Sequence, residues 1–307
     1  MAKIQARNID DALFARIEQA AMRNERSLEG EVRFALAAYY VPQVDHGPVL
    51  SKREHWQIET GERLRWLFER LLSDGYFDTW NKKRSVDTAD WVKIARQLEV
   101  SPGLLMDIIE GRQEITFSLA DAIAKHFNSS CEWLLSGEGM PFPVLNIGHS
   151  YHKFLLPDTD DGQNVFEFIR VEGGLHNGTL LILRKNIKTS ALSMGVVTSG
   201  FLLAEGMGSG GHGYLKSFLL FLKTKCHQLP INTYDFAPVD ADFDFWSVIG
   251  QHHPVWFQDA NRRSAASWLQ QMFIGDDPAD WFEGWSQDLK EIADTPFGGA
   301  KPDDEQL

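Results

Sequence analysis

The sequence predicts a multidomain protein, with a strand and two helices at the N-terminus, an all-α domain in the middle and an α+β domain in the C-terminal half. Three changes of pattern predict this order. Residues 1–40 alternate briefly and then repeat apolar side chains at helical spacing. Residues 59–143 carry helical repeats throughout, whereas residues 150–296 begin with β-rich runs bounded by glycine. A chain of 307 residues is long enough for this number of domains.

The N-terminal segment begins with an alternation of polar and apolar residues. Its polar side chains are those of Lys3, Gln5 and Arg7. Because they share one face of the predicted strand, they can all donate hydrogen bonds to base edges. Asp10 or Asp11 then begins a helix, a break follows at residues 23–26, and Ser27 caps a second helix.

Residues 4–11, followed by residues 24–32, resemble the ribbon-helix-helix family of Arc-type repressors and antitoxins. In that family two chains pair their strands into an antiparallel ribbon that lies in the major groove. The resemblance therefore implies a homodimer or higher even oligomer on double-stranded operator DNA. It also implies that the bases are read by Lys3, Gln5 and Arg7. The amides after Ser27, including that of Leu28, would hold a phosphate.

A dimer also follows from elementary packing, since a lone strand has no ladder partner and about forty residues bury too little apolar surface to fold alone. The alternative for this segment is an ordinary edge strand on a small helical domain.

The net charge of −13 is unusual for a protein that binds DNA, but the charge is unevenly distributed. Residues 151–307 contain 12 Lys and Arg against 21 Asp and Glu, so most of the excess lies there. The sequence has no apolar run of membrane-spanning length, and its first residues lead directly into polar sequence. Together with only two cysteines, this predicts a cytoplasmic protein without a membrane partner.

Residues 41–58 contain proline, glycine and mixed charge without periodicity, which is typical of a linker. The domain at residues 59–143 then carries five predicted helices. Ser101 followed by proline begins the third of these helices. Ser118 and Ser129 are expected to cap the fourth and fifth.

The turn at residues 95–101 and the closing segment at residues 133–139 resemble the Cro and phage-repressor helix-turn-helix family. The resemblance extends over residues 62–143. It implies that one helix, beginning after the turn, enters the major groove. The recognition-helix residues that it implies are Ser101, Gly103, Leu104, Met106 and Asp107.

Two features of this second segment leave its function open between two alternatives. In its recognition helix, Leu104 and Met106 could contact only the methyl group of a thymine, and Asp107 would repel phosphate. An insertion also separates the first two helices, at residues 73–88. The segment therefore either reads bases or serves as a dimerisation or partner-binding block. In the second case, the candidate phosphate contacts are Lys82, Lys83, Arg84 and Arg112.

The C-terminal half combines predicted strands with predicted helices. The β-rich runs are residues 165–171, 179–184 and 196–203. Asn177-Gly178 suits a tight turn between the first two runs. Helical spacing marks residues 265–273 and 281–292, whereas residues 214–223 suit either a helix or a strand. The last segment, residues 297–307, has the composition of a disordered tail.

No pattern in this half predicts catalysis, a cofactor or a metal. The glycine-rich segment at residues 206–211 fits G-x-G-x-x-G but lacks a clear βαβ context. The histidine spacings match no zinc pattern. Ser193 or Ser199 could pair with Lys216 as in a self-cleaving serine peptidase, but no local sequence pattern supports such a pair. The aromatic residues 243–246 and 256–257 suit core packing or a pocket for a small-molecule effector.

The sequence as a whole predicts a transcriptional regulator, most simply a dimeric repressor that is not an enzyme. Its C-terminal domain would supply dimer stability or bind a protein partner or an effector. The alternative is an antitoxin-like protein that neutralises a partner through its C-terminal half and regulates its own operon. A third and weaker alternative is an enzyme fused to DNA-binding modules.

Overall fold

The computed structural model describes residues 8–40, 50–77, 86–157, 163–237 and 244–299. These residues separate into two compact units, one within residues 1–52 and one within residues 53–307. The predicted strand with its base-reading side chains lies outside the described residues, as does the predicted Lys82–Arg84 phosphate contact.

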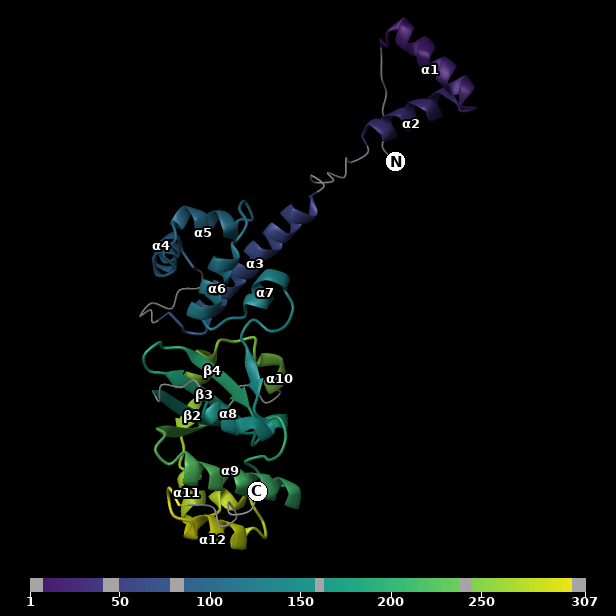
Figure 1. The fold of residues 1–307 in the computed structure, drawn as a ribbon. Coiled ribbons are helices and arrows are strands. Elements are labelled where there is room, and N and C mark those ends of the chain that lie inside the picture. The colour runs from purple at the N-terminus through teal and green to yellow at the C-terminus, as the bar shows by residue number, and fades with distance from the viewer. Residues whose placement is uncertain (1–7, 41–49, 78–85, 158–162, 238–243, 300–307) are drawn as a thin grey trace. The chain divides into compact units, whose positions relative to one another are not determined.

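The first unit contains helices α1 (Asp11–Arg23) and α2 (Leu28–Tyr39) (Figure 1). Both begin where the sequence predicts. The Asp10 carboxylate accepts from the Leu13 N–H at 3.0 Å, and the Ser27 hydroxyl accepts from the Gly30 N–H at 3.1 Å. Each cap satisfies one of the amide groups that a helix start leaves without a partner.

The second unit begins with a group of five helices. They are α3 (Lys52–Ser73), α4 (Thr88–Gln97), α5 (Pro102–Ile109), α6 (Phe117–His126) and α7 (Cys131–Ser136). Leu64, Leu67 and Phe68 of α3 are fully buried in a core shared with Leu105 of α5 and Ile123 of α6. The predicted apolar stripes therefore meet in one core.

Helix α3 starts earlier than the sequence predicts, so the predicted linker at residues 41–58 is wrong from Lys52 onward. The reason is tertiary. The Trp56 indole N–H donates to the Leu135 carbonyl at 2.8 Å, and Arg53 pairs with Glu114 at 2.7 Å. These contacts stabilise a turn of helix that carries no apolar repeat of its own.

Two predicted caps are also wrong. Thr116, not Ser118, caps α6, accepting from the Leu119 N–H at 3.2 Å. Ser130, not Ser129, caps α7, accepting from the Trp133 N–H at 3.1 Å. Several hydroxyl residues stand near each helix start, and all of them are good caps, so the sequence alone does not decide which of them caps.

The rest of the second unit is built on a mixed sheet. Its strands are β1 (Val144–Asn146), β2 (Asn164–Val171), β3 (Leu180–Asn186), β4 (Leu192–Val196), β5 (Ile231–Phe236) and β6 (Arg263–Ala265). Their order is β1-β4-β3-β2-β5-β6. The pair β2 and β3 is antiparallel, as predicted, whereas β2 and β5 are parallel.

The connection from β2 to β3 is longer than the predicted tight turn, because it contains a 3-10 helix at Gly174–His176. The third predicted strand, residues 196–203, is wrong except at its first residue, because the pairing of β4 with β3 starts at Leu192 and ends at Val196. Phe201 and Leu203 beyond it are buried without being in a strand. Their apolar character therefore reports burial rather than pairing.

Helices cover the sheet. They are α8 (Tyr151–Leu155), α9 (Ser209–Lys225), α10 (Phe245–Val248), α11 (Trp268–Ile274) and α12 (Ser286–Asp294). Further 3-10 segments are Gly148–Ser150, Pro254–Gln258 and Pro278–Asp280. Residues 214–223, which suited either structure, are helical in α9. The helices α9, α11 and α12 lie together against one face of the sheet (Figure 1).

Successive side chains of β2 pack on opposite faces of the sheet. Phe166 and Phe168 pack in the core beneath α9, whereas Ile169 and Val171 pack with Phe257 on the other face. The sheet is therefore buried on both sides.

The helices α3 to α7 are joined to the sheet by buried polar contacts. The Asp74 carboxylate, whose side chain is 1% exposed, accepts from the His253 N–H at 2.7 Å and contacts His252 Nδ1 at 2.7 Å. The Phe142 N–H donates to the Gly250 carbonyl at 3.0 Å. These helices and the sheet thus form one compact unit, and the predicted limits of a separate domain at residues 59–143 stay a prediction.

The start of the predicted disordered tail is packed, because the Gly298 N–H donates to the Lys223 carbonyl at 3.1 Å. Residues 300–307 of that tail lie outside the described residues. None of the helices in the described part of the chain has the length and apolar composition that a bilayer crossing requires.

Candidate nucleic-acid interface

The N-terminus of α2 is the best-defined candidate site in the first unit. Ser27 has extended backbone dihedrals, and its hydroxyl caps the helix. The N–H groups of Leu28 and Glu29 lie in the first turn, where no intrahelical acceptor is available. They point from the positive end of the helix dipole, which favours an anion such as a phosphate.

Side chains around the turn between α1 and α2 hold this helix end in place. Glu31 is 8% exposed, and its carboxylate accepts from Asn24 at 2.9 Å and from Arg26 at 3.2 Å. The Arg26 guanidinium also lies 3.9 Å from the centre of the Phe34 ring. The buried carboxylate therefore fixes the turn that precedes the cap.

This cluster was not predicted from the sequence, where residues 23–26 read only as a break. The only signal in the sequence was the position of Glu31, one helical turn after Ser27 and close to the break at residues 23–26. Its burial is visible only in the structure. A second acidic residue, Glu29, pairs with Arg33 at 2.8 Å. Its carboxylate lies in the first turn and offsets part of the positive potential offered to a phosphate.

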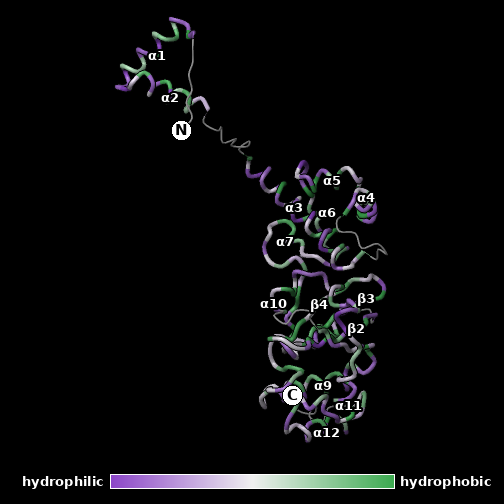
Figure 2. The backbone as a smooth tube through the Cα atoms, turned by 180° about the vertical axis from the view of Figure 1, so that it is seen from behind, coloured by the Kyte–Doolittle hydropathy of each residue, from purple (hydrophilic) through white to green (hydrophobic). Residues whose placement is uncertain are grey.

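The first unit leaves most of its apolar side chains exposed. Among the hydrophobic residues of its described part, only Ala21 is buried. Those exposed include Ile9, Leu13, Phe14, Leu28, Phe34 and Leu36. Hydrophobic and hydrophilic residues both occur along α1 and α2 (Figure 2). Such a helix pair lacks a core of its own and needs a partner surface.

The predicted recognition helix, α5, offers little to DNA. Ser101 caps it, accepting from the Leu104 N–H at 3.2 Å, and Gly103 is exposed. Leu104, Met106 and Asp107 are partly buried. No cationic side chain lies within α5.

Arg112, a predicted phosphate contact, lies just beyond this helix. Its guanidinium pairs with the Asp107 carboxylate at 2.8 Å and with that of Glu110. These two ion pairs oppose the predicted role, because a phosphate would have to compete with both carboxylates.

In the turn before α5, the Glu99 backbone has a φ of 57°.

The other motifs noted in the sequence acquire structural roles. In the glycine-rich segment at residues 206–211, Gly208 occupies the N-cap position of α9, and the helix follows directly after it. The Lys216 ammonium binds Asp288 at 2.8 Å and Glu291 at 2.6 Å. Burial alone would lower the pKa of Lys216, but these hydrogen bonds outweigh it and raise the pKa. A lysine held in the protonated state is poorly suited to activate a serine.

The described residues contain no cluster of three or more His, Cys, Asp or Glu side chains with metal-binding geometry.

The described part of the first unit thus consists of two capped helices joined by a short turn, with most of their apolar side chains exposed. Residues 2–40 match the family model described as "Antitoxin FitA-like, ribbon-helix-helix". The chain thus carries an N-terminal domain of this family, which is consistent with a DNA-binding regulator or an antitoxin. Neither a curated protein nor a solved structure matches the chain.

Proposed function

We propose that the protein is a sequence-specific DNA-binding transcriptional regulator that acts as a dimeric repressor. The observation that carries the proposal is the family match over residues 2–40, in which Ser27 caps the second helix. Two copies would pair their N-terminal strands into a ribbon in the major groove, and occlusion of the promoter would repress transcription.

Base reading is assigned to the polar face of that strand. Arg7 and Lys3 can pair with guanine, and Gln5 can pair with adenine. The amides of Leu28 and Glu29 would hold a backbone phosphate and so fix the register of the ribbon on the duplex.

The exposed apolar surface of α1 and α2 supports the dimer. A second copy would cover side chains such as Phe14, Phe34 and Leu36, which are 42%, 53% and 37% exposed. Burying such side chains contributes roughly 1.5–3 kcal/mol each when burial is complete. Folding of the domain and dimerisation would therefore be coupled.

We assign the Cro-like helix-turn-helix segment to assembly rather than to base reading. This assignment is supported by the composition of α5 and by the two carboxylates that hold Arg112. Any contact with DNA from this segment would then be to the phosphate backbone.

The test is a gel-shift competition between the operator, found by genome-wide footprinting, and base-substituted operators. Arg7→Ala and Gln5→Ala should each relax sequence preference by about 1–3 kcal/mol. Arg262→Ala, which removes an arginine of the second unit, is the matched control and should leave the preference unchanged. If Arg7→Ala retains full operator selectivity, the base-reading assignment is wrong.

A second candidate function is that of an antitoxin, which the description of the matched family favours. In that case the C-terminal half would neutralise a protein partner, and the N-terminal domain would regulate the operon. The protein purified from its native source distinguishes the two candidates. Light scattering should give an even multiple of 34.8 kDa for a self-sufficient regulator. An antitoxin should retain an additional chain of different mass.

A further inference from the structure

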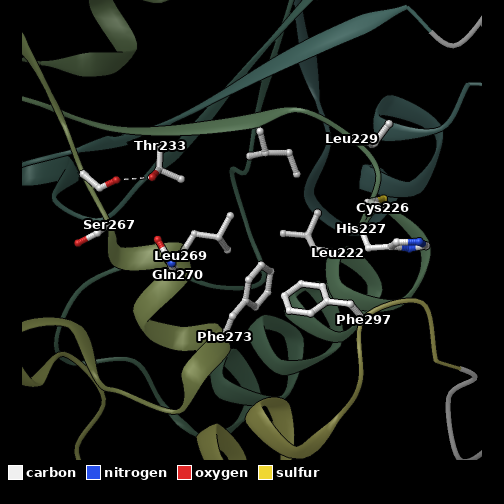
Figure 3. Close-up of a pocket in the computed structure, with 12 residues that line it drawn as sticks. Leu222, Cys226, His227, Leu229, Thr233, Ser267, Leu269, Gln270, Phe273 and Phe297 are labelled. Atoms are coloured by element: carbon white, nitrogen blue, oxygen red, sulfur yellow. Dashed lines mark hydrogen bonds between the residues drawn. The ribbon is translucent and has the colours of Figure 1, made fainter.

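A cavity of about 270 Å³ opens in the C-terminal part of the second unit. It lies between the end of α9, strand β5 and the start of α11 (Figure 3). Its apolar walls are Leu222, Leu229, Ile231, Leu269 and Phe273. These residues come from three separate segments of the chain, so the cavity exists only in the folded unit.

Polar groups lie at the rim of this cavity. The side chains of His227, Ser267 and Gln270 line it and belong to exposed residues. The Thr233 hydroxyl, by contrast, donates to the Ala266 carbonyl and is occupied. Figure 3 places Ser267 and Gln270 on one side of the cavity and His227 on the opposite side. Aliphatic and aromatic walls with a few hydrogen-bonding groups are the usual composition of a small-molecule site.

The cavity lining is uncharged. Its described lining residues include no Asp, Glu, Lys or Arg. The Cys226 thiol is buried, and burial raises its pKa to about 12, so it is neutral at physiological pH.

The Lys223 ammonium lies next to Phe297, one of the lining residues, at 5.0 Å from the centre of its ring. It donates to the carbonyls of Phe273, Ile292 and Ala293. Because an ammonium has three N–H donors, these bonds leave none for a ligand.

We propose that this cavity binds an uncharged amphiphile, with its apolar body between Leu222, Leu269 and Phe273 and its polar head at Ser267 and Gln270. The volume sets the size, since an apolar cavity of about 150 Å³ holds benzene, so this cavity suits a molecule of roughly ten non-hydrogen atoms. A charged head group would be disfavoured, because contact with Ser267 and Gln270 would replace part of its hydration while no lining Asp, Glu, Lys or Arg supplies an opposite charge. The proposal is independent of DNA binding.

Isothermal titration of the intact protein at pH 8 tests the proposal with three probes of equal chain length: 1-octanol, octanoate and octylammonium. Octanol should bind with a measurable heat, and each charged analogue should bind at least about tenfold more weakly. The absence of octanol binding would overturn the proposal. Equal binding of octanoate would overturn the assignment to an uncharged ligand.

Variants place the binding in this cavity. Ser267→Trp introduces a bulky ring at the exposed rim and should weaken octanol binding at least about tenfold, because the ring fills the mouth of a cavity of this size. Ile274→Trp is the matched control, since Ile274 is 64% exposed on the same helix and does not line the cavity. It should change the affinity by less than about twofold.

Octanol binding that survives Ser267→Trp unchanged would locate the ligand elsewhere and overturn the proposal.

Discussion

Acid should loosen the junction between the helices α3 to α7 and the sheet through one buried histidine. His253 is 1% exposed, and its ring lies between Tyr76, at 4.8 Å between centroids, and Phe142, at 5.3 Å. Its Nδ1 accepts from the Val255 N–H at 3.1 Å. Among the described residues, its Nε2 is buried without a partner. Burial lowers the pKa of His253 to about 3.

The sign of the effect follows from proton binding. In the unfolded chain a histidine has a pKa of about 6.5, so between pH 6.5 and 3 the unfolded state binds more protons than the folded state. The contribution of the neutral ring is complete above pH 6.5 and is lost as the pH falls toward 3. With the folded pKa near 3, the free energy of unfolding should drop by about 2 kcal/mol between pH 8 and pH 5 from this residue alone.

His253→Asn isolates this contribution. Asparagine is a good helix cap and can accept from the Val255 N–H, but it does not titrate. The variant should be less stable at pH 8, because it loses the packing of the ring between Tyr76 and Phe142. Its loss of stability between pH 8 and pH 5 should nevertheless be about 2 kcal/mol smaller than that of the wild-type protein.

Urea unfolding followed by tryptophan fluorescence at pH 8, 7, 6 and 5 measures both quantities. The matched control is His55→Asn, at an exposed position of α3, which should keep the wild-type pH dependence. If the His253→Asn protein loses as much stability at pH 5 as the wild type, the buried ring is not the source of the acid sensitivity.

The remaining predictions concern stability and DNA contact. Lys223→Met should lower the free energy of unfolding by about 3–5 kcal/mol, because three carbonyls lose their donor, whereas Lys290→Met at an exposed position should be nearly neutral in the same urea titration. Gly178→Ala should cost more than about 1 kcal/mol in thermal unfolding, since its φ is 85° and a Cβ would lie 2.6 Å from that of Ala204. Arg112→Ala should change operator affinity by less than about 0.5 kcal/mol in gel shifts, because two carboxylates already hold its guanidinium. A larger loss of operator affinity would show that Arg112 contacts DNA after all.

The candidate DNA-binding site was predictable to the extent that it depends on neighbouring residues. Asp10 and Ser27 cap α1 and α2 as expected, because a cap needs only a side-chain oxygen and an amide three residues later. The ion-paired state of Arg112 was not predictable. A sequence reports that a cation is present, whereas its availability depends on which carboxylates the fold brings beside it.

The sequence by itself determined where most helices lie, the pairing of β2 with β3, and the N-terminal motif that the family match confirms. Only the tertiary structure decided that α3 begins at Lys52, that β4 ends at Val196, and that α9, β5 and α11 enclose an uncharged cavity. The physical reason is range. Caps and apolar periodicity act over a few residues, whereas an early helix start, a strand end and a cavity depend on contacts between segments far apart in the chain.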